Sequence, residues 1–328
     1  MDQRTRNSNY AKWAGIFLWL FAGSMLSGCA GLFGQSDTGP QYAVPNPFAR
    51  VGEIPDSSDV PDELLFPKKL PRLADQDRER LGDTLLKRGD CAGAYVQFEK
   101  VLIDEPDNLR VQYKKGLTLL YGQQYPEAAS VFEHVLAHDP DHALAHLAVG
   151  QTYLELDRLE AAEEHLRSAL ELTPGRWDAH NLLGNIFDRQ KRYDEAVQEY
   201  HAALQISPSE AKLYNNLGVS YLLSNRFPQA ARAFEAALQN GFQDRQVYNN
   251  MGLAYGAMGE MDLALRAFRK GGPIAQAYNN LGCVYLNRSQ FALAVECFEK
   301  AIALSPQFYG KASDNLRHAQ FLASNQGQ

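Results

Sequence analysis

The densest group of residues able to do chemistry in this sequence is a run of four histidines. His134, His138, His142 and His146 are spaced four residues apart. On one continuous helix they would form a stripe of imidazoles able to bind a metal ion. Pro140 lies inside the run, and proline interrupts a helix because it lacks an amide hydrogen and its ring clashes with the preceding turn. We therefore expect these side chains to be solvated at a junction between helices, without a metal.

A second pattern with chemical meaning is a recurring pair of asparagines. The sequence Tyr-Asn-Asn-Leu-Gly stands at residues 214–218 and 278–282, and Tyr-Asn-Asn-Met-Gly stands at 248–252. A side-chain amide both donates and accepts hydrogen bonds, as a peptide unit does. A row of such amides could hold the backbone of an extended partner. The same amides could instead bridge neighbouring helices, and both roles stay open at this point.

Catalytic motifs are missing from the sequence. It has no Walker loop, no Gly-x-Ser-x-Gly, no His-Glu-x-x-His and no cysteine pair at zinc spacing. The formal net charge is -7 and no run rich in lysine and arginine occurs, which argues against nucleic acid as a partner. We expect a protein that is not an enzyme, needs no cofactor and binds other proteins.

Small and large residues recur along the chain every 34 residues, except in the last step, which is 30 residues long. A glycine marks each unit: Gly82, Gly116, Gly150, Gly184, Gly218, Gly252 and Gly282. An alanine follows after twelve residues: Ala94, Ala128, Ala162, Ala196, Ala230, Ala264 and Ala294. A large residue follows four further on: Phe98, Phe132, Leu166, Tyr200, Phe234, Phe268 and Phe298. Most units close on a proline that ends a helix: Pro106, Pro140, Pro174, Pro208 and Pro306.

This pattern resembles the tetratricopeptide repeat, a helix-turn-helix unit. The resemblance implies an all-α fold, a right-handed α-solenoid of about seven tetratricopeptide repeats over residues 75–308. Single units cannot bury their apolar faces alone, so neighbours must stack. Residues 309–328 supply a capping helix and tail, in which one helical face carries Ala312, Leu316, Ala319 and either Leu322 or Ala323. In the shortened sixth unit we expect the second helix to stop abruptly at the Gly-Gly-Pro sequence of residues 271–273.

In the tetratricopeptide family the first helix of each repeat lines a concave groove, on the face opposite the repeat glycine. Carried onto this sequence, that face holds apolar side chains in the second and third repeats and mostly amides in the later ones. The predicted peptide-binding groove comprises Asn181, Asn215, Asn216, Asn249, Asn250, Asn279, Asn280, Tyr113, Leu117, Leu147, Val219, Leu222 and Leu253.

The first 28 residues resemble the signal peptide of bacterial lipoprotein precursors. Three basic residues (Arg4, Arg6 and Lys12) precede an apolar stretch, which leads into Leu-Ser-Gly-Cys at 26–29. The resemblance implies lipidation of Cys29 and, because no aspartate follows it, delivery to the outer membrane on its periplasmic face. An uncleaved membrane anchor is the alternative, since residues 13–34 carry no charge.

Residues 29–74 are rich in proline, serine, aspartate and glycine and have no sustained periodicity, which predicts a semi-extended, lipidated tether. Within this tether, the sequence ELLFPKKLP at 63–71 could instead dock on the folded body. The cysteines beyond the tether are Cys91, Cys283 and Cys297. Their odd number and separate helices argue against a disulfide framework, so we expect them to pack as small residues.

The order of lipobox, Pro-rich tether and repeat array resembles the TadD-type lipoproteins of tight-adherence (Flp) pilus systems. This resemblance implies a scaffold or pilotin-like factor that helps to assemble a Flp/Tad pilus or secretion apparatus, with secretin or pilus-machinery components in the groove. Related lipoprotein scaffolds are the alternative: a type IV pilus pilotin, or an adaptor that gathers peptidoglycan hydrolases or proteases.

Overall fold

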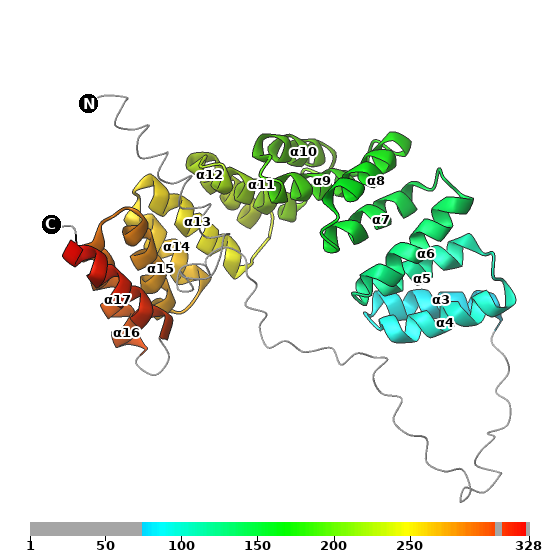
Figure 1. The fold of residues 1–328 in the computed structure, drawn as a ribbon, viewed down its shortest axis with the longest axis horizontal. Helices are drawn as coiled ribbons and strands as arrows, with labels where there is room; N and C mark the ends of the chain where they lie inside the picture. The colour runs from blue at the N-terminus through cyan, green and yellow to red at the C-terminus, as the bar shows by residue number, and fades with distance from the viewer. Residues whose placement is uncertain (1–73, 306–309, 326–328) are drawn as a thin grey trace, which may run out of the picture. The chain divides into compact units, whose positions relative to one another are not determined.

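The structure is a computed structural model that describes residues 74–305 and 310–325, and every regular element in these ranges is an α-helix (Figure 1). The predicted signal peptide, Cys29 and nearly all of the tether lie outside the described residues. Two compact units divide the chain, with their boundary inside helix α9. We call the described residues 74–186 the N-terminal unit and the described residues from 187 onward the C-terminal unit. The all-α prediction is confirmed.

Helix pairs build the N-terminal unit, and each helix from α3 to α8 contacts the next one. Their bounds are α3 (Asp75–Lys87), α4 (Cys91–Asp104), α5 (Leu109–Tyr121), α6 (Tyr125–His138), α7 (Ala143–Glu155) and α8 (Leu159–Leu172). Helix α9 (Trp177–Arg189) follows and crosses the boundary between the units. The predicted break between His138 and His142 is confirmed, because α6 ends before Pro140 and α7 begins after it.

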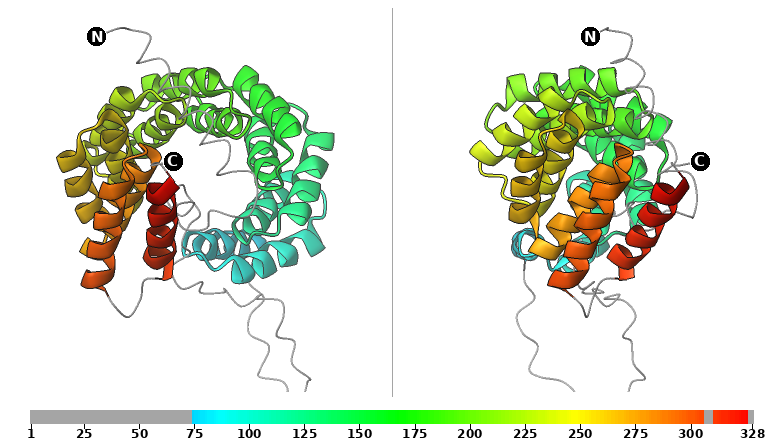
Figure 2. Two further views of the ribbon diagram at one scale, coloured as in Figure 1. Left: turned by 60° about the vertical axis from the view of Figure 1, so that its left-hand side comes forward. Right: turned by 90° about the vertical axis from the view of Figure 1, so that its left-hand side faces the viewer.

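The same arrangement builds the C-terminal unit, in which each helix from α10 to α17 contacts the next one. The bounds are α10 (Tyr193–Ile206), α11 (Ala211–Leu223), α12 (Phe227–Gln239), α13 (Arg245–Met258), α14 (Met261–Gly271), α15 (Ile274–Asn287), α16 (Phe291–Leu304) and α17 (Gly310–Asn325). Helix α17 lies alongside α16 in both views of Figure 2 and also contacts α15. It therefore takes the place that the first helix of another repeat would occupy.

A close contact between the repeat glycine and the large residue sixteen positions later joins the two helices of a repeat. A Cβ atom added at Gly218 would lie 2.6 Å from the ring of Phe234, and one at Gly252 would lie 2.5 Å from the ring of Phe268. Both rings are fully buried. No real Cβ tolerates that distance, so only glycine permits the two helices to pack this closely.

The turn between the two helices of each repeat has its own signature. The residue seven positions after each repeat glycine has a positive φ angle: Gly89, Gln123, Asp157, Lys191, Asn225, Gly259 and Ser289. Five of these seven are not glycine, although an L-residue in this left-handed region loses about 1–2 kcal/mol. The packing of the helices on either side therefore fixes the turn.

The two expected irregularities of the array are present. Helix α14 has 11 residues, whereas α12 has 13 and α16 has 14, and it ends at Gly271 as predicted. The capping helix buries Ala312 and Ala319, also as predicted. Ala323 is exposed, so it is not part of the packed face. The sequence pattern missed Asn315, which is 5% exposed on that face.

One carboxylate of the C-terminal unit is held in an unfavourable environment. Asp188, in the last turn of α9, accepts a hydrogen bond of 2.9 Å from the hydroxyl of Tyr200, which is the large residue of its repeat. Burial raises the pKa of Asp188 from 3.8 to about 6, and hydrogen bonds from Ser220 and Tyr200 oppose this shift only in part. At neutral pH the folded chain therefore contains a charge that burial destabilises.

Substituting Gly218 with alanine tests the glycine contact. Alanine favours a helix over glycine by about 1 kcal/mol, whereas forcing a methyl group against Phe234 costs about 1–3 kcal/mol. We expect a net loss of roughly 0–2 kcal/mol in the free energy of unfolding, measured by urea denaturation. Gly310→Ala is the control, because a Cβ atom added there would meet no other atom within 4 Å. Equal effects of the two substitutions would refute the packing explanation.

Substituting Asp188 with asparagine tests the buried charge. The carboxyl group titrates at a higher pH in the folded chain than in the unfolded chain, so the free energy of unfolding falls as pH rises from about 4 to about 6. Asparagine cannot ionise and keeps an oxygen for Tyr200. We expect Asp188→Asn to stabilise the chain by about 1–3 kcal/mol at neutral pH and far less at pH ~4. The matched change at exposed Asp262 should give no such gain, and a pH-independent effect at Asp188 would contradict the prediction.

Candidate peptide-binding groove

The asparagine pairs lie at equivalent places on the first helices of successive repeats. Helix α11 carries Asn215 and Asn216, α13 carries Asn249 and Asn250, and α15 carries Asn279 and Asn280. The pairs on α11 and α13 are half-buried. The pair on α15 is buried, with Asn279 7% exposed and Asn280 3% exposed. The three pairs therefore do not present the same surface.

Hydrogen bonds between repeats explain the burial of the last pair. Asn280 donates through Nδ2 to Oδ1 of Asn249 on the preceding repeat at 3.5 Å. Asn315 of the capping helix donates in the same way to Oδ1 of Asn279 at 3.0 Å. Asn279 and Asn280 thus join neighbouring helices, and their predicted place on an open groove is corrected. The bridging role that the sequence left open holds for these two residues.

Asn215 differs from the asparagines of the later repeats. Its Nδ2 donates to Oδ1 of the adjacent Asn216 at 3.4 Å. Its own Oδ1 is buried and has no hydrogen-bond partner among the described residues. A buried acceptor without a partner loses free energy, and most such groups in folded proteins are satisfied. This oxygen therefore keeps an unused acceptor position in the described structure.

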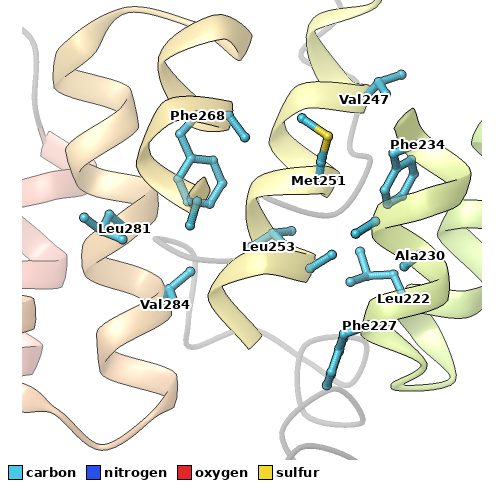
Figure 3. Packing of buried hydrophobic residues seen from close by; sticks show 14 of the residues in the cluster. Leu222, Phe227, Ala230, Phe234, Val247, Met251, Leu253, Phe268, Leu281 and Val284 are labelled. Carbon is cyan, nitrogen blue, oxygen red and sulfur yellow. The ribbon is translucent and has the colours of Figure 1, made fainter. Parts of the chain in front are cut away.

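The apolar residues predicted for the groove of the C-terminal unit separate into two kinds. Val219 is half-buried and stays on the surface beside the α11 asparagines. Leu222 and Leu253 are 1% and 9% exposed and belong to the core of this unit. Figure 3 shows Leu253 between Leu222 on one side and Val284 on the other. Their predicted role as open pockets is therefore corrected, since stacking of α11, α13 and α15 buries them.

In the N-terminal unit the predicted groove residues mainly support packing. The ring of Tyr113 lies 5.7 Å from that of Phe132 and 5.2 Å from that of His142. Burial, and to a lesser extent the neighbouring Tyr121, raise the pKa of Tyr113 to about 12, so its hydroxyl stays protonated. Leu117 and Leu147 are half-buried, and Asn181 is 6% exposed. Of these predicted residues, Asn181 is therefore buried, whereas Tyr113, Leu117 and Leu147 stay half-buried.

The histidine run separates into different local contacts. His142 caps α7 by accepting a hydrogen bond from the backbone nitrogen of Ala145 at 3.1 Å. The Nδ1 atoms of His146 and His165 are 3.0 Å apart, a partnership that the sequence pattern did not reveal. Among the residues that the structure describes, no group of three or more histidines, cysteines or carboxylates is arranged to hold a metal.

Tyrosines make a further set of links between repeats that sequence analysis missed. The hydroxyl of Tyr255 donates to Glu235 at 2.6 Å, and the hydroxyl of Tyr221 lies 3.0 Å from Nε2 of His201. Tyr153 and Glu133 form the same link in the N-terminal unit. Each pair is separated by 20 residues. That spacing can be read from the sequence, but it identifies residues in contact only when the stacking of the repeats is known.

The C-terminal unit thus offers a polar strip on the first helices of two repeats. Four half-buried amides line it, on Asn215, Asn216, Asn249 and Asn250, with Val219 beside them. Amides supply donors and acceptors without charge, so the strip suits the main chain of a partner better than a charged terminus. No general base, nucleophile or metal ligand is part of this strip.

Antiparallel helix pairs that pack chiefly on their sequence neighbours define an α-helical repeat protein. Models of the tetratricopeptide repeat match residues 113–176, 150–211, 189–252, 246–271 and 275–308, together more than half of the chain. The chain belongs to the tetratricopeptide repeat family, as the spacing of its glycines, alanines and large residues predicted.

Solved structures agree with this family. The crystal structure of a tetratricopeptide repeat protein from Parabacteroides merdae aligns with a TM-score of 0.53 and 16% identity, over 75% of this chain and 98% of that chain. A thermophilic protein of the family from Thermus thermophilus has a TM-score of 0.49 and 22% identity, over 55% and 98%. YrrB, a TPR protein with an unusual peptide-binding site, has a TM-score of 0.47 and 22% identity, over 57% and 97%. The first likeness shows the fold.

No curated protein matches the chain. Within residues 74–305 and 310–325, none of the helices combines the length and apolar character needed to cross a membrane. The apolar stretch of the predicted signal peptide lies outside these ranges.

Proposed function

We propose that the chain is a non-enzymatic scaffold that holds a segment of a partner protein on the amide strip of its C-terminal unit. The observation that carries this proposal is Oδ1 of Asn215, a buried acceptor without a partner on a face that is otherwise half-open. Once the side chain of Asn215 rotates toward the surface, an extended peptide would donate a backbone amide to this oxygen. Such a bond is worth about 0.5–1.5 kcal/mol, and it removes the penalty of the unmade bond.

The strip favours main-chain recognition over reading of a particular sequence. Asn216 and Asn250 add donors and acceptors on the same two helices, whereas Oδ1 of Asn249 already accepts from Asn280. Val219 offers an apolar contact on α11.

A charged partner terminus would need lysine or arginine beside the amides. Lys212 and Arg245 are exposed one turn before Asn216 and Asn249, whereas the amides themselves carry no charge. We therefore infer an extended segment that is held mainly through its main chain.

We further propose that the scaffold works at the periplasmic face of the outer membrane, anchored by lipid on Cys29. The support is the Leu-Ser-Gly-Cys sequence at 26–29 with its basic and apolar flanks, together with the Pro-rich tether of residues 29–74. A thioether-linked lipid with an additional acyl chain gives stable anchoring. The order of lipobox, Pro-rich tether and repeat array resembles that of the TadD-type lipoproteins. This resemblance supports a role in assembling a Flp/Tad pilus or secretion apparatus, with a secretin as the first candidate partner.

Asn215→Ala and Asn280→Ala form a matched pair that tests the strip. Asn280 is hydrogen-bonded to Asn249, so Asn280→Ala should lower the free energy of unfolding by about 1 kcal/mol. The folded Asn280→Ala chain should still bind the partner. Asn215→Ala should leave the melting temperature nearly unchanged and weaken binding about 2- to 10-fold. The measurement is affinity for the partner recovered by pull-down and mass spectrometry. If Asn215→Ala binds at full strength, the proposed strip is wrong.

Cys29→Ala tests the anchor separately. The variant should keep the helical circular dichroism and the melting curve of the parent, because Cys29 lies outside the repeats. It should also move out of the outer-membrane fraction, since the lipid supplies the attachment. The measurement is fractionation of cell envelopes in high salt. A variant that stays with the outer membrane would show that something other than Cys29 attaches the protein.

A further inference from the structure

The N-terminal unit has a groove on the face formed by the second helices of its repeats, away from the predicted peptide-binding residues. The groove lies between α4 and α6, above α5, and its volume is about 380 Å³. That size lies within the range of ligand pockets, about 300–1,000 Å³. Leu102, Ile103, Pro106 and Val131 give it an apolar lining, and Ile103 is 73% exposed, the highest value among the large apolar residues described.

The polar groups around this groove are already paired with one another. Gln112 donates through Nε2 to the carbonyl oxygen of Pro106 at 2.6 Å, and its Oε1 lies 2.6 Å from Nδ1 of His134. Lys115 forms an ion pair with Glu99. The groove therefore offers an occupant mainly an apolar surface, because most of its polar groups already have hydrogen-bond or ion-pair partners.

An acidic loop borders one end of the groove. It follows Asp104, the last residue of α4, and carries Glu105 and Asp107 on either side of Pro106. We include Asp104 in the acidic loop. The first turn of α3 is fixed at the same loop, because Arg78 forms ion pairs with Asp75 at 2.8 Å and with Asp104 at 3.5 Å. The N-terminal end of α3, at which the described chain begins, therefore lies beside this acidic loop.

We propose that residues 64–72 of this same chain occupy the groove. Their sequence is LLFPKKLPR, with an apolar group at its start and basic residues after it. Leu65 and Phe66 match the apolar lining, and Lys68, Lys69 and Arg72 match the acidic loop. Surface ion pairs contribute little, so the apolar contact supplies most of the affinity. The charges determine in which direction the segment runs along the groove.

The geometry of the chain permits this docking. From Phe66 to Leu73 are seven residues, which reach up to about 25 Å when extended. That length is sufficient to cross the end of α4 from the first turn of α3. Because the segment is covalently joined to the unit, its effective concentration is of order millimolar, and a weak contact suffices. The docked segment would cover Ile103 and determine where the tether leaves the repeats, independently of the proposed peptide-binding strip.

Zero-length carbodiimide cross-linking of the full chain tests the proposal. This reagent joins a lysine amine directly to a carboxylate. We expect Lys68 or Lys69 to be joined to Glu105 or Asp107 within one chain. An equal mixture of ¹⁴N- and ¹⁵N-labelled protein distinguishes links within a chain from links between chains. The Lys114–Asp83 ion pair, with its atoms 2.6 Å apart, supplies an internal reference yield.

Two substitutions and two controls decide the outcome. Phe66→Asp in the segment and Ile103→Asp in the groove should each reduce the cross-link about 10-fold or more relative to the reference. Against the described repeats alone Ile103 is 73% exposed, so its substitution should leave the packing of the repeats intact. Phe48→Asp in the tether and Leu172→Asp, 40% exposed at the end of α8, should keep the cross-link. No cross-link, a link only between chains, or a yield that either test substitution leaves unchanged would overturn the proposal.

Discussion

The architecture of this protein depends on one contact, between a glycine of the first helix and a large side chain of the second helix in each repeat. Where Phe234, Phe268 and Phe298 meet their glycines, the space left for a Cβ atom is 2.6 Å or less. The contact sets how closely the two helices approach and hence which residues point to the next repeat. Because every repeat carries the same constraint, the other positions of the unit are free to differ. That freedom is what allows asparagine, histidine and leucine to alternate on otherwise equivalent faces.

Hydrogen bonds between neighbouring repeats also depend on the regular spacing of the helices. Tyrosine hydroxyls reach back to the preceding second helix, as from Tyr255 to Glu235, and asparagines reach back to the preceding first helix, as from Asn280 to Asn249. The capping helix satisfies the last repeat through Asn315. Residues of one type therefore serve structure where a neighbour supplies the complementary group. Where no neighbour supplies that group, a polar atom stays without a partner, as Oδ1 of Asn215 does among the described residues.

Sequence alone determined the fold well and the site only partly, for a physical reason. The spacing of Gly218, Ala230 and Phe234 encodes contacts within one repeat, where sequence distance and spatial distance agree, so the helix pairs, the short α14 and the capping helix followed from it. The burial of Leu222 and the bond between Asn249 and Asn280 depend on how one repeat stacks on the next. The pattern of side chains on one face of a helix does not show how one repeat is rotated against the next. The predictions for Cys29 and the tether concern residues outside the described ranges and stay predictions.

The left-handed turn residues have a consequence for how this chain can change. Gln123, Asp157, Lys191, Asn225 and Ser289 adopt a conformation that glycine adopts without steric cost, and only two of the seven turns use glycine. Glycine there would remove about 1–2 kcal/mol of strain but would cost about 0.5–1 kcal/mol in chain entropy, so the net gain is about 0–1.5 kcal/mol at each turn. The chain could therefore gain stability at five separate positions, none of which belongs to the amide strip. A lineage or a protein engineer could raise its resistance to heat one repeat at a time while the recognition surface continued to diversify.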